Sequence, residues 1–209
     1  MESVELYFSF RSPYSWLVFH RLEAAFRDLP VALTFVPAYP AGDFPNDPAA
    51  LPAKLAYLIA DVGRIAEAYG LSPRWPGKID TDWPRPHAAF LGADDRGRGL
   101  AFARAAFAAR FEHGLDLAED STLEGVARAC GEDPQRVVRD ADDPALCERT
   151  RASLARRRES GVFGVPTFVY REQKFWGNDR LEWLVRAIRR DAGLPVPDLR
   201  AAALATPAG

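Results

Sequence analysis

Every second residue at the start of the chain is strongly apolar, which predicts a strand with one apolar face. These residues are Val4, Leu6, Phe8 and Phe10. Ser12 followed by Pro13 is typical of a helix N-cap and first helical position, and apolar residues then recur every three or four positions as far as about residue 28. A second strand is expected over residues 31–36. Because strand–helix–strand crossovers are right-handed, these two strands should be parallel neighbours.

The middle of the chain, from about residue 50 to 160, contains helix and turn patterns and no convincing strand. Proline-rich stretches cover residues 37–52 and 72–86. Between them a helix ending at Gly70 is expected to bury one face. That face consists of Leu55, Leu58, Ile59, Val62, Ile65 and Tyr69. Further on, residues 121–124 have the pattern of a capping box, and Asp133 and Asp143 each precede a proline, as N-caps do.

Strand patterns return at residues 165–170, and a polar turn leads to residues 175–177, which predicts a short hairpin. Asn178 can cap a last helix that ends at Gly193. The order is therefore β-α-β, a long helical insertion, then β-β-α, which is the connectivity of an α/β thioredoxin-like fold. We expect a thioredoxin-like domain over residues 1–45 and 161–195, an all-helical insertion domain over residues 46–160, and a loosely held tail over residues 196–209.

Composition narrows the possible functions. The 27 Lys and Arg residues nearly balance 29 Asp and Glu residues, for a net charge of −2, so nucleic acid and membrane surfaces are not expected partners. The first apolar stretch is too short to span a bilayer and lacks the cationic flank of a signal peptide, which predicts a cytoplasmic protein. Cys130 and Cys147 form no Cys-x-x-Cys pair and are expected to be free thiols. The three histidines lack metal-ligand spacing, so no metal site is expected.

The segment FSFRSPYSWL, residues 8–17, resembles the active-site motif of the 2-hydroxychromene-2-carboxylate isomerases and the kappa-class glutathione transferases, both DsbA-like thioredoxin-fold families. Three later segments fit the same resemblance in the same order: residues 45–48, 161–167 and 175–180. The position that carries two thiols in disulfide oxidoreductases carries the hydroxyls of Ser12 and Ser15 here. A hydroxyl cannot cycle through a disulfide, so dithiol redox catalysis is excluded at this position.

The resemblance implies a glutathione site with Ser12 as the catalytic residue. A serine at a helix N-terminus can donate a hydrogen bond to an anion, here the thiolate of glutathione, and the helix dipole favours the negative charge. The resemblance also implies that Val165 and Pro166, as a cis-proline segment, bind the cysteinyl unit of glutathione. It assigns the γ-glutamyl end to Asn178 and Asp179, and it places Trp176 and Gly177, which precede them, among the glutathione-binding residues.

Two further residues are assigned by the resemblance or by charge. Asn46 matches a family asparagine that reaches the ligand across the cleft, and Lys54 can meet the carboxylate of an aromatic substrate. Each residue also has a simpler interpretation: Ser12 and Asn178 as helix caps, Asn46 as a turn residue, and Lys54 as a solvated lysine. Ser9 and Arg11 depart from the family, which usually has an aspartate and an apolar residue there.

The resulting hypothesis is a glutathione-dependent cis-trans isomerase in aromatic degradation, resembling 2-hydroxychromene-2-carboxylate isomerase and acting on a small aromatic substrate. The resemblance also implies a homodimer. Two alternatives stay open. A kappa-like glutathione transferase would share the ligand residues but consume glutathione, and a non-catalytic thioredoxin-like binding module would have no activity.

Overall fold

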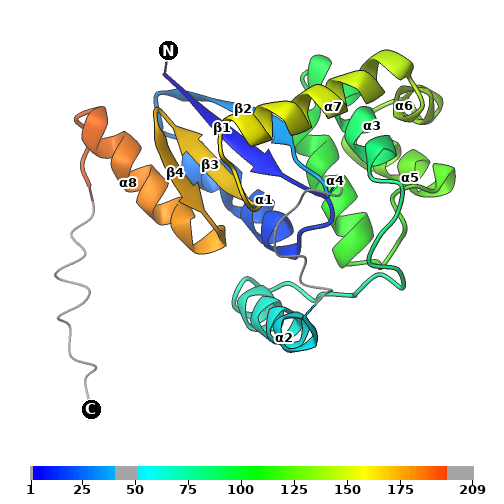
Figure 1. Cartoon of the computed structure of the whole chain (residues 1–209), viewed down its shortest axis with the longest axis horizontal. Helices are drawn as coiled ribbons and strands as arrows, with labels where there is room; N and C mark the ends of the chain where they lie inside the picture. The colour runs from blue at the N-terminus through cyan, green and yellow to red at the C-terminus, as the bar shows by residue number, and fades with distance from the viewer. Residues whose placement is uncertain (1, 41–50, 197–209) are drawn as a thin grey trace.

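A computed structural model describes residues 2–40 and 51–196 (Figure 1). At its centre lies a mixed four-stranded sheet with strand order β2-β1-β3-β4. The strands are β1 (Glu2–Phe8), β2 (Val31–Pro37), β3 (Thr167–Tyr170) and β4 (Gln173–Trp176). The first two are parallel, as the crossover rule predicts, while β3 runs antiparallel to both β1 and β4. The predicted hairpin is therefore confirmed, and β1 lies in the interior of the sheet.

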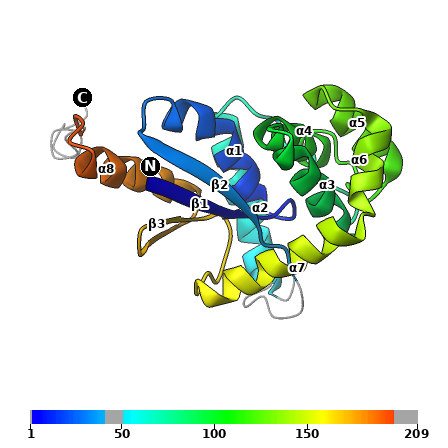
Figure 2. The same ribbon diagram turned by 90° about the horizontal axis from the view of Figure 1, so that it is seen from above.

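The predicted apolar face of β1 is confirmed, and the opposite face is also partly covered. Val4, Leu6 and Phe8 are fully buried on one face, and Tyr7 is fully buried on the other. The strand has neighbours on both edges and helices on both sides of the sheet. Figure 2 shows α1 (Pro13–Phe26) on one side and α7 (Pro144–Glu159) on the other. Phe10, expected in the strand, lies in the loop that follows it.

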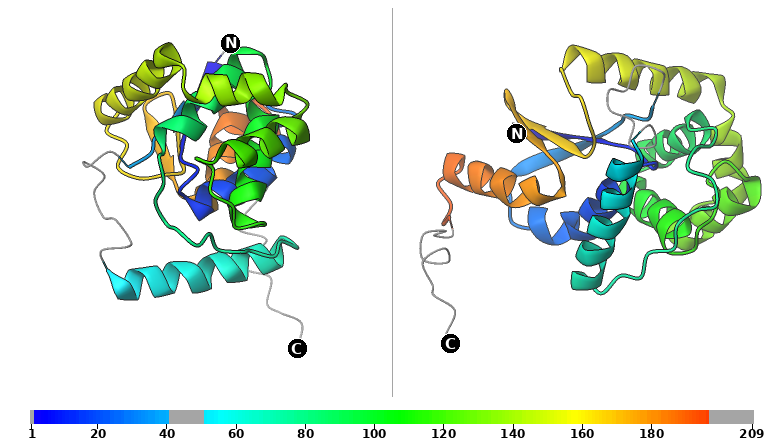
Figure 3. Two further views of the ribbon diagram at one scale, coloured as in Figure 1. Left: turned by 90° about the vertical axis from the view of Figure 1, so that its right-hand side faces the viewer. Right: turned by 60° about the horizontal axis from the view of Figure 1, so that its bottom comes forward.

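The predicted helical insertion is present. Its helices are α2 (Pro52–Ala68), α3 (Pro84–Asp95), α4 (Gly99–Phe111), α5 (Asp120–Cys130), α6 (Pro134–Ala141) and α7. Phenylalanines of α3 and α4 pack against the end of β1: the ring of Phe8 lies 5.0 Å from Phe90, and the ring of Phe10 lies 5.0 Å from Phe107. The insertion and the sheet thus share one hydrophobic core. Helix α2 lies apart from the other insertion helices (Figure 3).

Three local expectations about the insertion are wrong. Helix α3 begins inside the second proline-rich stretch, because prolines are tolerated in a first helical turn where N–H groups have no partner. Helix α5 begins after Glu119, without a side-chain cap from the predicted capping box. Helix α2 buries only Val62 and Ala66, and Ile59 remains 42% exposed, because little of the protein packs against this helix.

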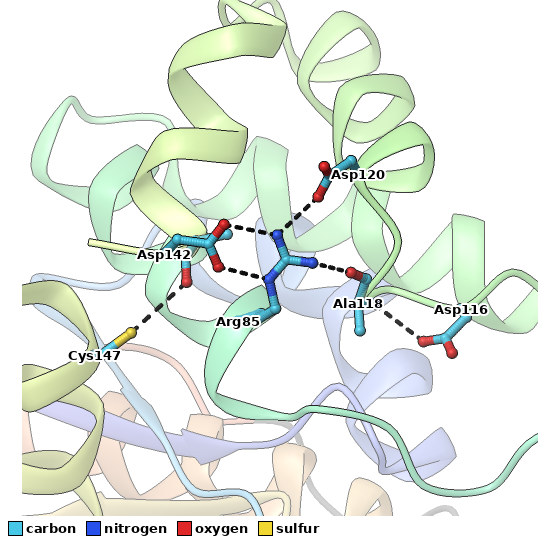
Figure 4. Close-up of polar contacts among 7 residues, drawn as sticks. Arg85, Asp116, Ala118, Asp120, Asp142 and Cys147 are labelled. Atoms are coloured by element: carbon cyan, nitrogen blue, oxygen red, sulfur yellow. Dashed lines mark hydrogen bonds and ion pairs between the residues drawn. The ribbon is translucent and has the colours of Figure 1, made fainter. Parts of the chain in front are cut away.

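Arg85 anchors the start of α3 to the rest of the insertion (Figure 4). Its guanidinium donates two hydrogen bonds to Asp142, at 2.8 and 2.9 Å, and one to Asp120 at 2.8 Å. It also donates to the carbonyl oxygen of Ala118. The hydrogen bonds to Asp142, followed by the contact with Asp120, raise the pKa of Arg85. The beginning of α3 is thereby fixed, and this matters because residues there contact the loop before α1.

The last helix, α8 (Leu181–Asp191), follows a short 3₁₀ helix, η2 (Asn178–Arg180). The expectation that Asn178 caps the last helix is wrong, because Arg180 holds the N-cap position and the Asn178 side chain bonds elsewhere. The predicted tail falls outside the described residues from residue 197 onward. None of the described helices combines the length and apolar character needed to cross a membrane.

Candidate functional site

Ser12 lies in the loop between β1 and α1, at the N-cap of α1. Its hydroxyl oxygen accepts a hydrogen bond from the backbone N–H of Ser15 at 3.2 Å, and its own N–H donates to the Ser9 carbonyl at 3.0 Å. Pro13 occupies the first helical position. The predicted N-cap is therefore confirmed. Because unpaired N–H groups and the helix dipole point toward this end of α1, the position favours negative charge.

Ser12 contacts the segment that leads into β3, the strand next to β1. Its hydroxyl lies 3.4 Å from the carbonyl oxygen of Val165, to which it can donate. The Val165–Pro166 peptide bond is cis, as the resemblance implies, and the Pro166 carbonyl accepts a hydrogen bond from Gly177 N–H at 2.9 Å. The loop before α1 and the segment before β3, 153 positions apart in the sequence, thus meet at Ser12. The 3.4 Å contact is long for a hydrogen bond between a hydroxyl and a carbonyl, so this proton can be redirected toward a bound anion.

Asn178 is nearly fully buried and joins η2 to α2. Its side-chain N–H donates to the hydroxyl of Tyr69 at 3.3 Å, and its backbone carbonyl accepts from Arg21 at 3.4 Å. The guanidinium of Arg21 also lies over the Tyr69 ring, 5.4 Å from its centre. The side-chain oxygen of Asn178 is buried and has no hydrogen-bond partner among the described residues. A buried acceptor left unsatisfied is costly, and the N–H of a ligand could satisfy it.

The other residues assigned near Asn178 are more exposed. Asp179 forms an ion pair with Arg180 at 2.9 Å, and its side chain is 70% exposed. Trp176 is 53% exposed and packs edge-on against Phe163, with ring centres 4.8 Å apart. Its indole also covers Gly164: a Cβ at that position would lie 2.6 Å from the indole nitrogen. Gly164 is therefore required for this approach, which sets the path of the chain into Val165.

Arg11 links the Ser12 loop to the connection between α2 and α3. Its Nε lies 2.6 Å from Oδ1 of Asp80, and its Nη2 lies 3.2 Å from Oδ2. Trp83 also donates to Asp80, from its indole nitrogen at 3.1 Å. The hydrogen bond from Arg11 lowers the pKa of Asp80. Arg110 lies over the Trp83 ring, 4.6 Å from its centre, and burial lowers its pKa to about 10, so it remains charged at neutral pH.

His87, in the core, supports the loop between β1 and α1 that carries Ser12. Its Nδ1 lies 2.7 Å from the Trp83 carbonyl, which can only accept, so Nδ1 carries the proton. Its Nε2 then accepts a hydrogen bond from the backbone N–H of Phe10 at 3.3 Å. Burial lowers the pKa of His87 to about 4, in keeping with this neutral tautomer. A neutral histidine thus joins the start of α3 to the loop that carries Ser12.

Helix α2 is held to the two segments that carry the assigned ligand residues. Tyr14, in the first turn of α1, donates a hydrogen bond to Asp61 at 2.7 Å, and Tyr69 near the end of α2 accepts the bond from Asn178. Burial and the hydrogen bond to Asp61 raise the pKa of Tyr14, so this hydroxyl stays protonated. These two hydrogen bonds add to the apolar contacts of Val62 and Ala66 in holding α2 against α1 and η2.

The family model of the DSBA-like thioredoxin domain matches residues 3–189. The chain belongs to the DsbA-like thioredoxin family. Within this family it is similar to the 2-hydroxychromene-2-carboxylate isomerase of Sphingobium xenophagum, with 28% identity over 191 residues that cover 88% of this chain and 96% of the relative. The protein of the same name from Pseudomonas putida is 28% identical over 193 residues, covering 90% and 94%.

A solved structure of 2-hydroxychromene-2-carboxylate isomerase has the same fold as this DsbA-like chain. The TM-score is 0.81 with 26% sequence identity, over 98% of this chain and 100% of the other. The similarity therefore includes both the sheet and the helical insertion. Because the relatives are named isomerases, the comparisons favour an isomerase over a disulfide oxidoreductase, and the chain has serines rather than cysteines at positions 12 and 15.

The structure brings together Ser12, Val165 and Pro166, and it places Gly177 beside Pro166. Their roles toward a ligand stay predictions. Lys54 lies with an exposed side chain in the first turn of α2, and Asn46 lies outside the described residues. Both cysteines of this DsbA-like protein are free, as expected. Among residues 2–40 and 51–196, no group of three or more histidine, cysteine or acidic side chains could hold a metal ion.

Sequence reasoning missed two contributors, His87 and Tyr14. The spacing of the histidines indicates no role for His87, although the apolar residues that follow it in α3 signal burial. Its partner Phe10 lies 77 positions away, and no local pattern indicates that pairing. Tyr14 forms part of the active-site motif, but its partner Asp61 lies on a different helix. Both contacts depend on how the insertion packs on the sheet.

Proposed function

We propose that this protein is a glutathione-dependent cis-trans isomerase that acts on an aromatic carboxylate of the 2-hydroxychromene-2-carboxylate type. The observation that carries the proposal is the hydroxyl of Ser12 at the N-terminus of α1, beside the cis Val165–Pro166 bond. The names of the relatives supply the reaction class and the aromatic carboxylate. A disulfide oxidoreductase would need thiols at the position that Ser12 and Ser15 occupy.

Residues of this site are suited to a tripeptide ligand. Val165 can offer its backbone polar groups, and the unsatisfied oxygen of Asn178 can accept an N–H from the ligand. Asp179 is exposed and carries the charge needed to pair with the ligand's ammonium group. When bound, glutathione supplies a thiolate that can add to a conjugated carbon, so that the former double bond becomes a single bond about which the substrate can rotate, and expulsion of the thiolate then restores the double bond in the other geometry.

Ser12 has the properties needed to stabilise a thiolate. Its oxygen accepts the Ser15 N–H, which strengthens the hydroxyl as a donor, and its proton makes only a long contact with Val165. Lowering a thiol pKa by two units, from about 8.5 to about 6.5, requires about 2.7 kcal/mol. A charge-assisted hydrogen bond provides about 1.5–3 kcal/mol, and a favourable helix terminus up to about 2 kcal/mol. The two effects together are of the required size.

The test is isomerisation of 2-hydroxychromene-2-carboxylate, followed spectroscopically with and without glutathione. We expect Ser12→Ala to lower kcat/KM by about ten- to a hundredfold, the loss of one charge-assisted hydrogen bond. Ser12→Thr keeps the hydroxyl and should retain most of the activity. Ser121→Ala, on the exposed face of α5, is the matched control and should behave as wild type.

The same assay separates the alternatives. A constant glutathione concentration during turnover supports an isomerase, and stoichiometric thiol loss with an electrophilic acceptor indicates a transferase instead. If the wild-type protein does not accelerate isomerisation in the presence of glutathione, the proposed function is wrong. Equal activity of wild type and Ser12→Ala would remove the role assigned to Ser12.

A further inference from the structure

The carboxylate of Asp80 accepts hydrogen bonds from Arg11, the residue that precedes Ser12, and from Trp83. Two N–H groups of Arg11 face its two oxygens, at 2.6 and 3.2 Å, and the indole N–H of Trp83 faces one of them at 3.1 Å. A guanidinium presents its N–H groups as a planar fork that matches the two oxygens of a carboxylate. The three donors together would bind any carboxylate that replaced the one of Asp80.

Arg11 and Asp80 differ in how firmly the protein holds their side chains. The side chain of Arg11 is only 12% exposed, and it follows a loop fixed by His87 and by the N-cap of α1. The side chain of Asp80 is 59% exposed and belongs to the connection between α2 and α3. Asp80 can therefore swing into solvent with little loss of packing, whereas the donors from Arg11 and Trp83 stay in place.

The surrounding charges favour an incoming anion. Arg110 is 2% exposed, lies over the Trp83 ring and adds a second positive charge beside Asp80. Asp116 and Asp80 are the acidic groups that act on Arg110. When Asp80 moves away, the guanidinium groups of Arg11 and Arg110 and the indole N–H of Trp83 remain as groups that attract an anion.

The donors around Asp80 and the predicted glutathione residues at the cis-proline segment come from different parts of the fold. Val165 contacts Ser12 from the β3 side of the sheet, whereas Asp80 and Trp83 belong to the helical insertion. A tripeptide on the sheet side would leave the insertion side to the second ligand. The carboxylate of that ligand would then lie next to the residue that handles the reacting thiol.

We propose that Arg11 binds the carboxylate of the substrate, and that Asp80 occupies the same donors until substrate displaces it. The proposal rests on the proposed function, because it takes the second ligand to be an aromatic carboxylate. It makes Arg11 the substrate-binding residue that selects carboxylates over neutral aromatic compounds. Asp80 then acts as an internal competitor whose removal should tighten substrate binding.

The test measures binding rather than turnover. Calorimetric titrations with 2-naphthoate and with the neutral 2-naphthamide, both at saturating glutathione, give the preference for a carboxylate. We expect wild type to prefer 2-naphthoate by about tenfold or more, as a charge-assisted two-bond contact provides, and Arg11→Gln to abolish the preference. Asp80→Asn should strengthen 2-naphthoate binding by about twofold to fivefold, the range measured for partly exposed ion pairs.

A matched control and a second variant keep the test decisive. Arg149 forms a similar two-bond pair with Asp95, at 2.5 and 2.8 Å, between α7 and α3, so Arg149→Gln should leave the preference unchanged. Arg11→Lys keeps the charge but loses the fork, and should retain only part of the preference if Arg11→Gln fails to fold. Equal preference in wild type and either Arg11 variant overturns the proposal, as does failure of wild type to bind 2-naphthoate.

The two proposals fail in different experiments. If 2-naphthoate binds through Arg11 but the chromene does not isomerise, the carboxylate-binding role of Arg11 stands and the proposed function is wrong. If the chromene isomerises and Arg11→Gln leaves both its KM and the 2-naphthoate preference unchanged, the function stands and the role of Arg11 is wrong.

Discussion

His87 makes the stability of this protein depend on pH in a way that can be calculated from the structure. The residue is fully buried, and its Nε2 accepts a hydrogen bond from Phe10 N–H. Protonation would place an N–H of the imidazolium against the N–H of Phe10, and burial already opposes the charge. The pKa is accordingly lowered from 6.5 to about 4.

The sign and size follow from proton binding in the two states. Above pH 6.5 His87 is neutral in both folded and unfolded chains, so it causes no pH dependence. As pH falls below 6.5, the unfolded chain binds a proton that the folded chain resists, and the free energy of unfolding decreases until about pH 4. A shift from 6.5 to about 4 corresponds to about 3 kcal/mol in total, of which about 2.5 kcal/mol is already lost at pH 4.5.

The perturbation is His87→Gln, which keeps an acceptor for Phe10 N–H but cannot titrate. Urea unfolding at pH 7 and pH 4.5 gives the free energy of unfolding for each protein. At pH 7 the variant should be less stable by about 1–3 kcal/mol, because the Trp83 carbonyl loses its donor. Between pH 7 and pH 4.5 it should lose about 2.5 kcal/mol less than wild type.

Exposed His113 provides the control, since His113→Gln should leave the pH dependence of wild type unchanged. In wild type, the imidazole proton resonances of His87 should titrate in NMR spectra near pH 4. A wild-type pKa near 6.5, or parallel pH profiles for wild type and His87→Gln, would show that the buried neutral histidine does not govern acid stability.

Two further predictions concern the neighbourhood of Ser12. Gly164→Ala places a Cβ 2.6 Å from the indole nitrogen of Trp176, so we expect a loss of about 1–3 kcal/mol in unfolding free energy and weaker glutathione binding by calorimetry. Gly125→Ala, at an open position in α5, is the control and should stabilise by up to about 1 kcal/mol; equal effects would contradict the close approach. Tyr14→Phe removes the hydrogen bond to α2, so limited proteolysis of the α2–α3 connection should accelerate while stability falls by about 1 kcal/mol. Tyr57 lies on α2 with 61% of its surface exposed, so Tyr57→Phe should be cleaved at the wild-type rate. Equal cleavage rates for the Tyr14 and Tyr57 variants would refute the role of Tyr14 in anchoring α2.

Much of the fold was readable from local patterns. The cap at Ser12 and the N-caps at Asp133 and Asp143 depend on residues within three positions of one another, so the sequence contains the complete interaction. The parallel pairing of the first two strands follows from the handedness of the crossover. Features that depend on a packing partner far away in the sequence could not be predicted as well from local patterns. The two-sided burial of β1 depends on what covers each face of the sheet.

For the candidate site, the sequence alone determined the chemical character: hydroxyls replace thiols at the start of α1, and a Val-Pro segment precedes the hairpin. Only the tertiary structure decided which side chains surround Ser12. It joins Phe10 to His87 over 77 positions, Arg11 to Asp80 over 69, and Tyr14 to Asp61 over 47. The physical reason is that caps and turns are satisfied by neighbours along the chain, whereas buried polar groups and charges take whatever partner the packed core brings within hydrogen-bond distance.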